Sequence, residues 1–256
     1  MPPNDAFISA LIITYNEAAN IGACIDSLTG VADEIIVVDS FSTDATAEIC
    51  SQKQVRFIQH AFEGYIEQKN YASTLANFPY LLSLDADEVL SDELRQSILA
   101  VKQQPKYDAY YVNRLNNYCG QWIRHGNWYP DRKLRLWNKN KGRWGGSKIH
   151  ERLILSEGAK TSRLSGDLLH YTVKSIAQHL GQINKFTSIR AEEMFNKGRK
   201  PNFYYLWCKP AVSFFWSYFV KRGFLDGYLG LIISLNSAYA VFLRYAKLKE
   251  LWSKSH

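Results

Sequence analysis

Two carboxylates stand one residue apart in the segment Leu84-Asp-Ala-Asp-Glu88, directly after the apolar run Leu81–Leu84. If that run is a buried strand, it holds the backbone firmly while Asp85 and Asp87 project toward the same side. Hard oxygen ligands suit Mg²⁺ or Mn²⁺, and such an ion can bridge two phosphates and stabilise a departing diphosphate. The pattern therefore predicts a divalent-metal site. The alternative is a capped loop before a helix that begins near Ser91.

Polar residues also follow two other short β-branched runs, where a nucleotide could be held. Asp39 closes one run, and a carboxylate there can accept a hydrogen bond from a ribose hydroxyl or a base N–H. Tyr15 could stack on a base and Glu17 could hydrogen-bond it, while Asn16 serves either the nucleotide or a helix cap. We predict nucleotide contacts at these four residues. The sequence has no GxGxxG motif, which argues against NAD or FAD.

Basic side chains supply partners for phosphates. Lys69 lies in Gln68-Lys-Asn70 at the expected start of a helix, a place suited to phosphate binding. Arg135 carries a guanidinium group that can hold a phosphate through two hydrogen bonds. The competing interpretations are that Lys69 is a solvated surface side chain and that Arg135 forms a surface ion pair. His170 is a further candidate metal ligand, with a core histidine as its alternative.

A general base for an acceptor hydroxyl is expected among the remaining carboxylates. Glu151 is the first choice, because it lies in the dense polar run Lys148–Arg152 between a Trp/Gly-rich loop and an apolar strand. Asp131 and Glu88 are the alternative bases. His150 either orients the base or the acceptor, or is a structural residue. Transfer of a sugar to an acceptor hydroxyl needs only one catalytic carboxylate when a metal ion stabilises the leaving group. A glycosidase would need two carboxylic groups.

The elements that must position these residues can be predicted from hydrophobic periodicity. The first hundred residues alternate β-branched runs with helical patterns, which predicts βαβ units and a mostly parallel sheet. Ligands of open α/β sheets bind beyond the carboxyl ends of the strands, so the polar clusters should converge there. Segment 107–170 is predicted to form strands and long loops. Strands are expected at 7–14, 34–39, 55–59 and 80–84, and helices at about 16–28, 42–50 and 67–76.

The predicted domain organisation is a catalytic domain at 1–174 and a helical extension at 175–256. Within the domain, residues 1–100 form the nucleotide-sugar-binding half and residues 101–174 the acceptor-side half. The chain carries a net charge of +7, and residues 185–256 contribute twelve Lys and Arg against four acidic residues. Because the basicity is confined to this aromatic extension, a nucleic-acid-binding core is disfavoured.

The extension is expected to lie on an anionic membrane surface as in-plane amphipathic helices, since charged residues interrupt its apolar runs. Packing of these helices on the domain or in an oligomer is the alternative. The four cysteines are dispersed without zinc spacing, and the first residues lack the pattern of a signal peptide. These features indicate a cytoplasmic protein of 256 residues with one large α/β domain and an appendage.

Four segments together resemble glycosyltransferase family 2: Ile12–Glu17, Glu34–Asp39, Gln68–Asn70 and Leu84–Glu88. Later segments resemble a branch of that family, the bacterial lipopolysaccharide-core enzymes that place β-glucose on an inner-core heptose: Pro130–Arg132, Arg135–Trp137, Ile149–Glu151 and Leu169–Tyr171. The resemblance covers nearly the whole chain.

This resemblance implies an α/β fold of the GT-A type, Rossmann-like and nucleotide-binding, followed by the basic, aromatic helical segment. It also implies a UDP-sugar donor, a glycolipid acceptor, inversion at the anomeric carbon and a peripheral location at the inner face of the bacterial inner membrane. It places nucleotide, metal and catalytic functions on residues already named: Tyr15, Glu17, Asp39 and Lys69 for the nucleotide, Asp85 and Asp87 for the metal, and Glu151 for catalysis.

The expected activity is that of a metal-dependent, inverting hexosyltransferase. One alternative is a family 2 transferase acting on a polyprenyl-phosphate, O-antigen or capsule acceptor. A nucleotidyltransferase is disfavoured because the chain lacks a glycine-rich phosphate loop near its start. A membrane-associated carbohydrate-binding scaffold without activity is a third possibility, and the acidic pair with Glu151 argues against it.

Overall fold

The computed structural model describes residues 6–147 and 150–255. Contacts within the chain divide it into two compact units. The N-terminal unit comprises Met1–Arg114 and Asp131–His170, and the C-terminal unit comprises Leu115–Pro130 and Tyr171–His256. Residues 115–130 thus group with the C-terminal helices, although the sequence placed them in the acceptor-side half. The division into 1–174 and 175–256 stays a prediction.

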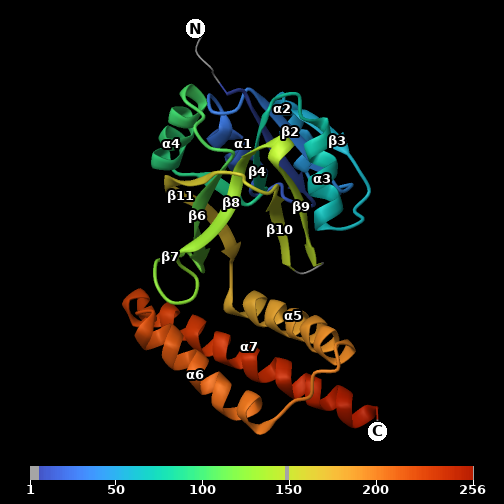
Figure 1. Ribbon diagram of the computed structural model, residues 1–256, viewed down its shortest axis with the longest axis vertical. Coiled ribbons are helices and arrows are strands. Elements are labelled where there is room, and N and C mark those ends of the chain that lie inside the picture. The colour runs from blue at the N-terminus through green and yellow to red at the C-terminus, as the bar shows by residue number, and fades with distance from the viewer. Residues whose placement is uncertain (1–5, 148–149, 256) are drawn as a thin grey trace. The chain divides into compact units, whose positions relative to one another are not determined.

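The N-terminal unit is built on one sheet whose first four strands are parallel (Figure 1). In spatial order they are β3 (Arg56–Gln59), β2 (Glu34–Asp39), β1 (Ile8–Thr14) and β4 (Tyr80–Asp85). The sheet continues through β8 (Asp131–Asn138), β6 (Ala109–Tyr118), β11 (Thr161–Val173) and β5 (Glu88–Leu90), with β7 (Gln121–Ile123) paired on β6. β9 (Gly142–Ser147) and β10 (His150–Leu155) form a hairpin. The α/β fold class and the four parallel strands are confirmed.

Helices cover both faces of the parallel strands, because successive side chains of a strand point to opposite sides. Ile8, Ala10 and Ile12 belong to a buried cluster with α1 (Ile21–Leu28), α2 (Thr46–Gln52) and α4 (Asp92–Gln103). On the other face, Leu11 packs in a cluster with α3 (Tyr65–Leu75), β9 and the fully buried Trp137. A short 3₁₀ turn, η1 (Lys139–Lys141), joins β8 to β9.

The register of the parallel strands aligns their carboxyl ends. Thr14 pairs with Asp39 across β1 and β2, and Ile13 pairs with Asp85 across β1 and β4. β1 lies between β2 and β4, so the strand order reverses beside it, which is where open sheets bind ligands. The convergence expected from the sequence is therefore present.

One predicted helix cap was wrong. Asn16 does not cap the first helix; α1 begins at Ile21, with Asn20 at its N-cap position. Asn16 instead has a φ of 54°, a left-handed conformation that asparagine tolerates better than most residues. Its side-chain oxygen accepts a hydrogen bond from the Thr43 N–H at 2.8 Å. The residue thus ties the turn after β1 to the loop after β2.

The C-terminal unit is helical, as predicted. Its main helices are α5 (Ile176–Asn196), α6 (Lys209–Phe215) and α7 (Gly227–Lys254), joined through the π-helical turns η2 (Tyr204–Cys208) and η3 (Trp216–Val220) and the 3₁₀ turn η4 (Gly223–Asp226). α5 and α7 pack through Ala191, Met194, Tyr245 and Leu248. The carboxylate of Asp226 is nearly buried and accepts from the backbone N–H of His125 at 2.9 Å, which fixes the loop after β7.

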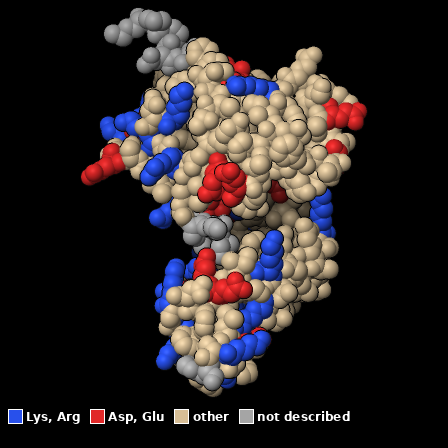
Figure 2. Space-filling model, turned by 90° about the vertical axis from the view of Figure 1, so that its right-hand side faces the viewer, with Lys and Arg blue, Asp and Glu red and all other residues tan. Residues whose placement is uncertain are grey.

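The surface of this unit is rich in exposed rings and in basic side chains. Lys and Arg side chains are spread over this unit, with fewer Asp and Glu among them, as Figure 2 shows for one face. Residues 223–254 form one helical segment that is long and apolar enough to cross a membrane, judged by length and composition only. Whether these helices lie in the plane of a membrane, as expected from the charged residues that interrupt the apolar runs, stays a prediction. Exposed apolar side chains include Phe203, Trp207, Phe215, Trp216, Phe219 and Tyr228.

Gly166 in β11 permits a close approach of two backbones. Its φ is 85°, and a Cβ at this position would overlap the backbone nitrogen of Leu94 and lie 2.8 Å from the carbonyl carbon of Glu93. We predict that Gly166→Ala lowers the free energy of unfolding by about 2–5 kcal/mol, from the left-handed backbone and the overlap together. Urea denaturation measures the loss.

Gly158→Ala is the matched control, because Gly158 has a φ of 76° but no atom within 4 Å of an added Cβ. It should cost only the conformational part, about 1–2 kcal/mol. Equal losses in the two variants would show that the approach to α4 contributes nothing.

Candidate functional site

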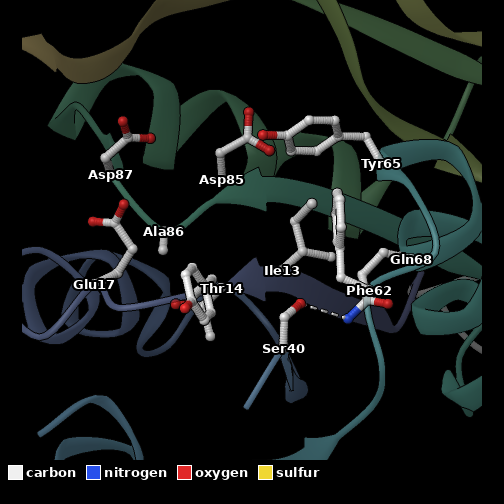
Figure 3. Close-up of a pocket in the computed structure, with 11 residues that line it drawn as sticks. Ile13, Thr14, Glu17, Ser40, Phe62, Tyr65, Gln68, Asp85, Ala86 and Asp87 are labelled. Carbon is white, nitrogen blue, oxygen red and sulfur yellow. Dashed lines mark hydrogen bonds between the residues drawn. The ribbon is translucent and has the colours of Figure 1, made fainter. Parts of the chain in front are cut away.

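A cavity of about 420 Å³ lies at the carboxyl ends of β1, β2 and β4, and we call it the sheet-edge cavity (Figure 3). Segments that follow these strands contribute its lining, together with the start of α3. The structure therefore brings together four residues singled out from the sequence. The lining residues are Ile13, Thr14, Tyr15, Glu17, Ser40, Phe62, Tyr65, Gln68, Asp85, Ala86 and Asp87.

Asp85 is held between two cations. Lys69 Nζ lies 3.0 Å from its Oδ1, and Arg135 Nη2 lies 2.9 Å from its Oδ2. Burial by itself raises the pKa of this carboxyl, but the charges of Lys69 and Arg135 outweigh burial and hold the pKa well below its usual value. Asp85 is therefore ionised at neutral pH, and the stability gained from this shift is lost progressively as the pH falls below the unfolded-state pKa and through the lowered pKa.

Glu88 is fully buried and supports Asp85 from behind. Its Oε2 accepts from the Asp85 backbone N–H at 2.9 Å, and its Oε1 accepts from Arg135 Nη2 at 2.6 Å. Arg114 Nη1 lies 3.4 Å from the same Oε1. A carboxylate enclosed in this way positions other groups rather than meeting a substrate.

Asp87 lies beside His170, with 3.3 Å between Oδ2 and Nε2. The pair forms because β11 runs antiparallel to β5 with His170 opposite Glu88, the residue after Asp87. Within residues 6–147 and 150–255, no three His, Cys, Asp or Glu side chains converge as a metal cluster. Mg²⁺ commonly takes only one or two carboxylates and completes its shell with substrate phosphates and water. Asp87, a single carboxylate at the edge of the cavity, fits such an ion, and a metal site at Asp85, Asp87 and His170 stays a prediction.

The four predicted nucleotide residues divide into two groups. Tyr15, 58% exposed, and Glu17 line the sheet-edge cavity, where Glu17 Oε2 accepts from Asn20 Nδ2 at 2.6 Å. Asn16 and Asp39 instead hold loops: Asp39 is fully buried and accepts from the Ser42 backbone N–H at 2.8 Å. Nucleotide contact at all four residues stays a prediction.

A second cavity of about 420 Å³ adjoins the first, and we call it the basic cavity. Asp85 lines both cavities, so they meet at that carboxylate. Glu151 lies in the basic cavity with its Oε1 3.6 Å from Lys69 Nζ. The lining residues are Lys69, Asp85, Tyr111, Arg114, Arg132, Lys133, Leu134, Arg135, Trp144, Glu151, Arg152 and Leu153.

The other candidate catalytic residues differ from Glu151. Both oxygens of Asp131 are engaged, with Arg114 Nη2 at 2.8 Å and Lys133 Nζ at 3.1 Å. Burial raises the pKa of Asp131, but Arg114 and Lys133 lower it more, so it is a weaker proton acceptor than an ordinary aspartate. The side chain of His150 lies outside the described residues.

Sequence reasoning missed Trp144, whose ring lies under Lys69 with 4.6 Å between Nζ and the ring centroid. Asn70 fixes this tryptophan, because its amide accepts from the Trp144 N–H and donates to the Trp144 carbonyl, each at 3.0 Å. The Trp/Gly-rich composition of the loop was the only available signal. Tyr65 was also missed; it points toward Asp85 (Figure 3), and its pKa is raised by burial and by the charge of Glu151.

Arg135 offers a test of the buried charges. We predict that Arg135→Met lowers the free energy of unfolding by about 3–5 kcal/mol, because it leaves the Glu88 carboxylate buried without its nearest cation. Adding Glu88→Gln should recover part of that loss, which is the signature of two coupled residues. Urea denaturation of both single variants and the double variant measures the coupling. Additive losses would show that the two side chains act independently.

The chain is similar over most of its length to known proteins. Residues 9–154 match the family described as glycosyl transferase family 2. An uncharacterized glycosyltransferase of Rickettsia bellii is 34% identical over 261 residues, which cover 95% of this chain and 86% of that protein. The lipopolysaccharide core biosynthesis glycosyltransferase LpsC of Rhizobium meliloti is 32% identical over 250 residues, covering 94% and 91%.

Among solved structures, the mannosyltransferase PcManGT from Pyrobaculum calidifontis, in complex with GDP-Man and Mn²⁺, has the same kind of fold. Its TM-score to this chain is 0.58 at 14% sequence identity, with 99% of this chain and 89% of that chain covered.

Proposed function

This chain belongs to glycosyltransferase family 2, and we propose that it transfers glucose from UDP-glucose to a heptose of the lipopolysaccharide inner core, with inversion at the anomeric carbon. The observation that carries the proposal is the position of Asp85, which lines both cavities. A donor in the sheet-edge cavity and an acceptor in the basic cavity would meet at this residue. The name of LpsC, a relative along nearly the whole chain, supports the acceptor class.

The donor nucleotide is proposed to occupy the sheet-edge cavity. Tyr15 would stack on the uracil ring and Glu17 would accept a hydrogen bond from the nucleoside. Thr14 Oγ1 also belongs to this lining and is a buried polar atom with no hydrogen-bond partner in the described chain, so a bound ligand would satisfy it.

Mg²⁺ or Mn²⁺ is proposed to be held by Asp87, with Asp85 and His170 beside it. When bound, such an ion neutralises charge on the departing diphosphate. The GDP-Man and Mn²⁺ complex of PcManGT supports this kind of cofactor on this fold. Lys69 would face the diphosphate from the other side of Asp85. Arg135 was predicted to bind phosphate, but its Nη2 contacts two carboxylates, so we propose that it orients Asp85.

Glu151 is proposed to accept the proton of the acceptor hydroxyl. It lines the basic cavity with 28% of its side chain exposed, while Asp131 and Glu88 are occupied by neighbouring cations. Lys69 contacts both Asp85 and Glu151, which supports a base close to the reacting end of the donor. A single base acting opposite the leaving group inverts the anomeric carbon.

A donor and acceptor screen tests the proposed function. UDP release from several UDP-sugars is measured with Mn²⁺, and again after the metal is removed by EDTA. Products from lipopolysaccharide-core and polyprenyl-phosphate acceptors are then compared. Transfer of glucose to the core acceptor, lost with EDTA and restored by Mn²⁺, supports the proposal. Transfer only to polyprenyl phosphate would favour the alternative acceptor class.

Two carboxylate variants should separate binding from chemistry. Glu151→Gln is expected to keep UDP-sugar affinity while turnover falls by about 10²–10⁴-fold, the usual cost of a lost general base. Asp87→Ala should abolish Mn²⁺-dependent UDP-sugar binding. Calorimetry reports the affinity and UDP release reports the turnover. Near-normal turnover in the first variant, or unchanged Mn²⁺-dependent binding in the second, would contradict the role of that residue.

The C-terminal unit is proposed to hold the protein on the cytoplasmic face of the membrane. Several exposed rings lie within residues 203–228, and basic side chains are interspersed with them, such as Lys209, Lys221 and Arg222. Rings that enter the headgroup boundary next to cations that face anionic lipids are typical of surface-bound helices. Such a location would bring the site to a lipid-linked acceptor.

Replacing two of these rings tests membrane binding. We predict that Trp207→Ser with Phe215→Ser lowers partitioning onto anionic liposomes by at least about tenfold, because each ring would lose its burial in lipid. Leu180→Ser with Phe186→Ser is the matched control, since both side chains are exposed on α5 of the same unit. Co-sedimentation with anionic and neutral vesicles measures partitioning. Equal partitioning of all three proteins would dismiss the membrane role.

A further inference from the structure

We infer that the acceptor carries an anionic group, a phosphate or a carboxylate, close to its reacting sugar, and that Arg132 and Arg152 bind this group in the basic cavity. The inference rests on the proposed function in one respect, that the basic cavity receives the acceptor. It adds a chemical requirement on the substrate and two residues that select for it.

The charges of the basic cavity are only partly compensated. Six basic side chains line it, and four of them have carboxylate partners within 4 Å. Arg132 and Arg152 are exposed and make no ion pair within the described part of the chain. The compensated four are Lys69 with Asp85 and Glu151, Arg135 with Asp85 and Glu88, Arg114 with Glu88 and Asp131, and Lys133 with Asp131.

The uncompensated charge extends beyond this cavity. An adjoining cavity of about 390 Å³ shares Tyr111 and Arg132 with it. This third cavity adds Arg163, which is exposed and likewise has no ion-pair partner within residues 6–147 and 150–255. Three guanidinium groups therefore line a continuous path away from Asp85. Guanidinium groups bind phosphate and carboxylate through paired hydrogen bonds, so an extended anionic saccharide fits this path.

Two buried donors provide independent support for a ligand rich in oxygen. Arg135 Nε and Trp144 Nε1 are buried atoms with no hydrogen-bond partner in the described chain, and both residues line the basic cavity. Arg135 is only 4% exposed and Trp144 only 6%. Buried donors of this kind are costly unless an acceptor atom meets them. An oxygen-bearing ligand in this cavity would supply such acceptors.

The diphosphate of the donor is the competing occupant. Arg132 and Arg152 do not line the sheet-edge cavity, where Asp87 and the proposed metal would hold the diphosphate. The two arginines lie instead with Glu151, on the side proposed for the acceptor. Their position therefore favours an anion on the acceptor, and the affinity for UDP separates the two occupants.

The test compares charged and neutral acceptors. A heptose-containing core oligosaccharide is used intact, after phosphatase treatment, and after chemical reduction of its carboxyl groups. For each acceptor, kcat/KM is measured by UDP release and affinity by calorimetry, in the wild type and in a variant with Arg132→Gln and Arg152→Gln. Arg143→Gln is the control, because Arg143 is exposed on the hairpin that carries Arg152 and lines neither the basic cavity nor the adjoining one.

We expect removal of the anionic group to lower kcat/KM of the wild type by about tenfold or more, through KM, since hydrogen bonds to charged groups have this magnitude. The double variant should show the same loss on the intact acceptor and no further loss on the neutral one. Its affinity for UDP should be unchanged. The preference of the wild type for the charged acceptor should weaken as salt is added. Sensitivity to phosphatase or to carboxyl reduction tells which anion is bound.

Two results would overturn the inference: equal kcat/KM and affinity for charged and neutral acceptors in the wild type, or a loss of UDP affinity in the double variant as large as its loss of acceptor affinity. Failure of the proposed function looks different, because no core acceptor would then be turned over. In that event the calorimetric preference for the intact oligosaccharide over its neutral forms still decides the inference.

Discussion

The guanidinium of Arg135 is shared by the carboxylates of Asp85 and Glu88, at 2.9 and 2.6 Å from one nitrogen. Glu88 is fully buried, so its charge is tolerated only with a close cation and good geometry. The same cation then fixes Asp85, which lines both the sheet-edge cavity and the basic cavity. The orientation of Asp85 thus depends on buried charges that the protein itself supplies.

The sheet topology explains why this cluster can form. β8 runs antiparallel beside β4, with Leu136 paired to Leu82, so the chain returns after 50 residues and delivers Arg135 next to Asp85. β11 returns later and sets His170 opposite Glu88. A parallel half supplies the strand ends, and antiparallel strands from the second half supply their partners. Each half would leave charged groups without compensation if it stood alone.

The local features were predictable from the sequence, and the partnerships were not. Hydrophobic periodicity located β1, β2 and β4 and hence the polar residues at their ends, because those residues depend only on neighbours along the chain. Asn16 was assigned to the wrong cap because its real partner, Thr43, lies in another loop. The contacts of Glu88 and Trp144 could not be predicted from the sequence for the same reason. Their partners, Arg135 and Asn70, become visible only once the strands are paired.

Lys69 links the two carboxylates of the site, Asp85 and Glu151. It is 3% exposed, lies over the Trp144 ring, and contacts Asp85 at 3.0 Å and Glu151 at 3.6 Å. A long flexible side chain is well ordered only where packing removes its freedom, and the ring supplies that packing. Because Lys69 cannot move without disturbing its packing on the ring, its contacts with Asp85 and with the proposed base Glu151 are set by the fold itself. Preorganisation of this kind reduces the rearrangement required when donor and acceptor bind.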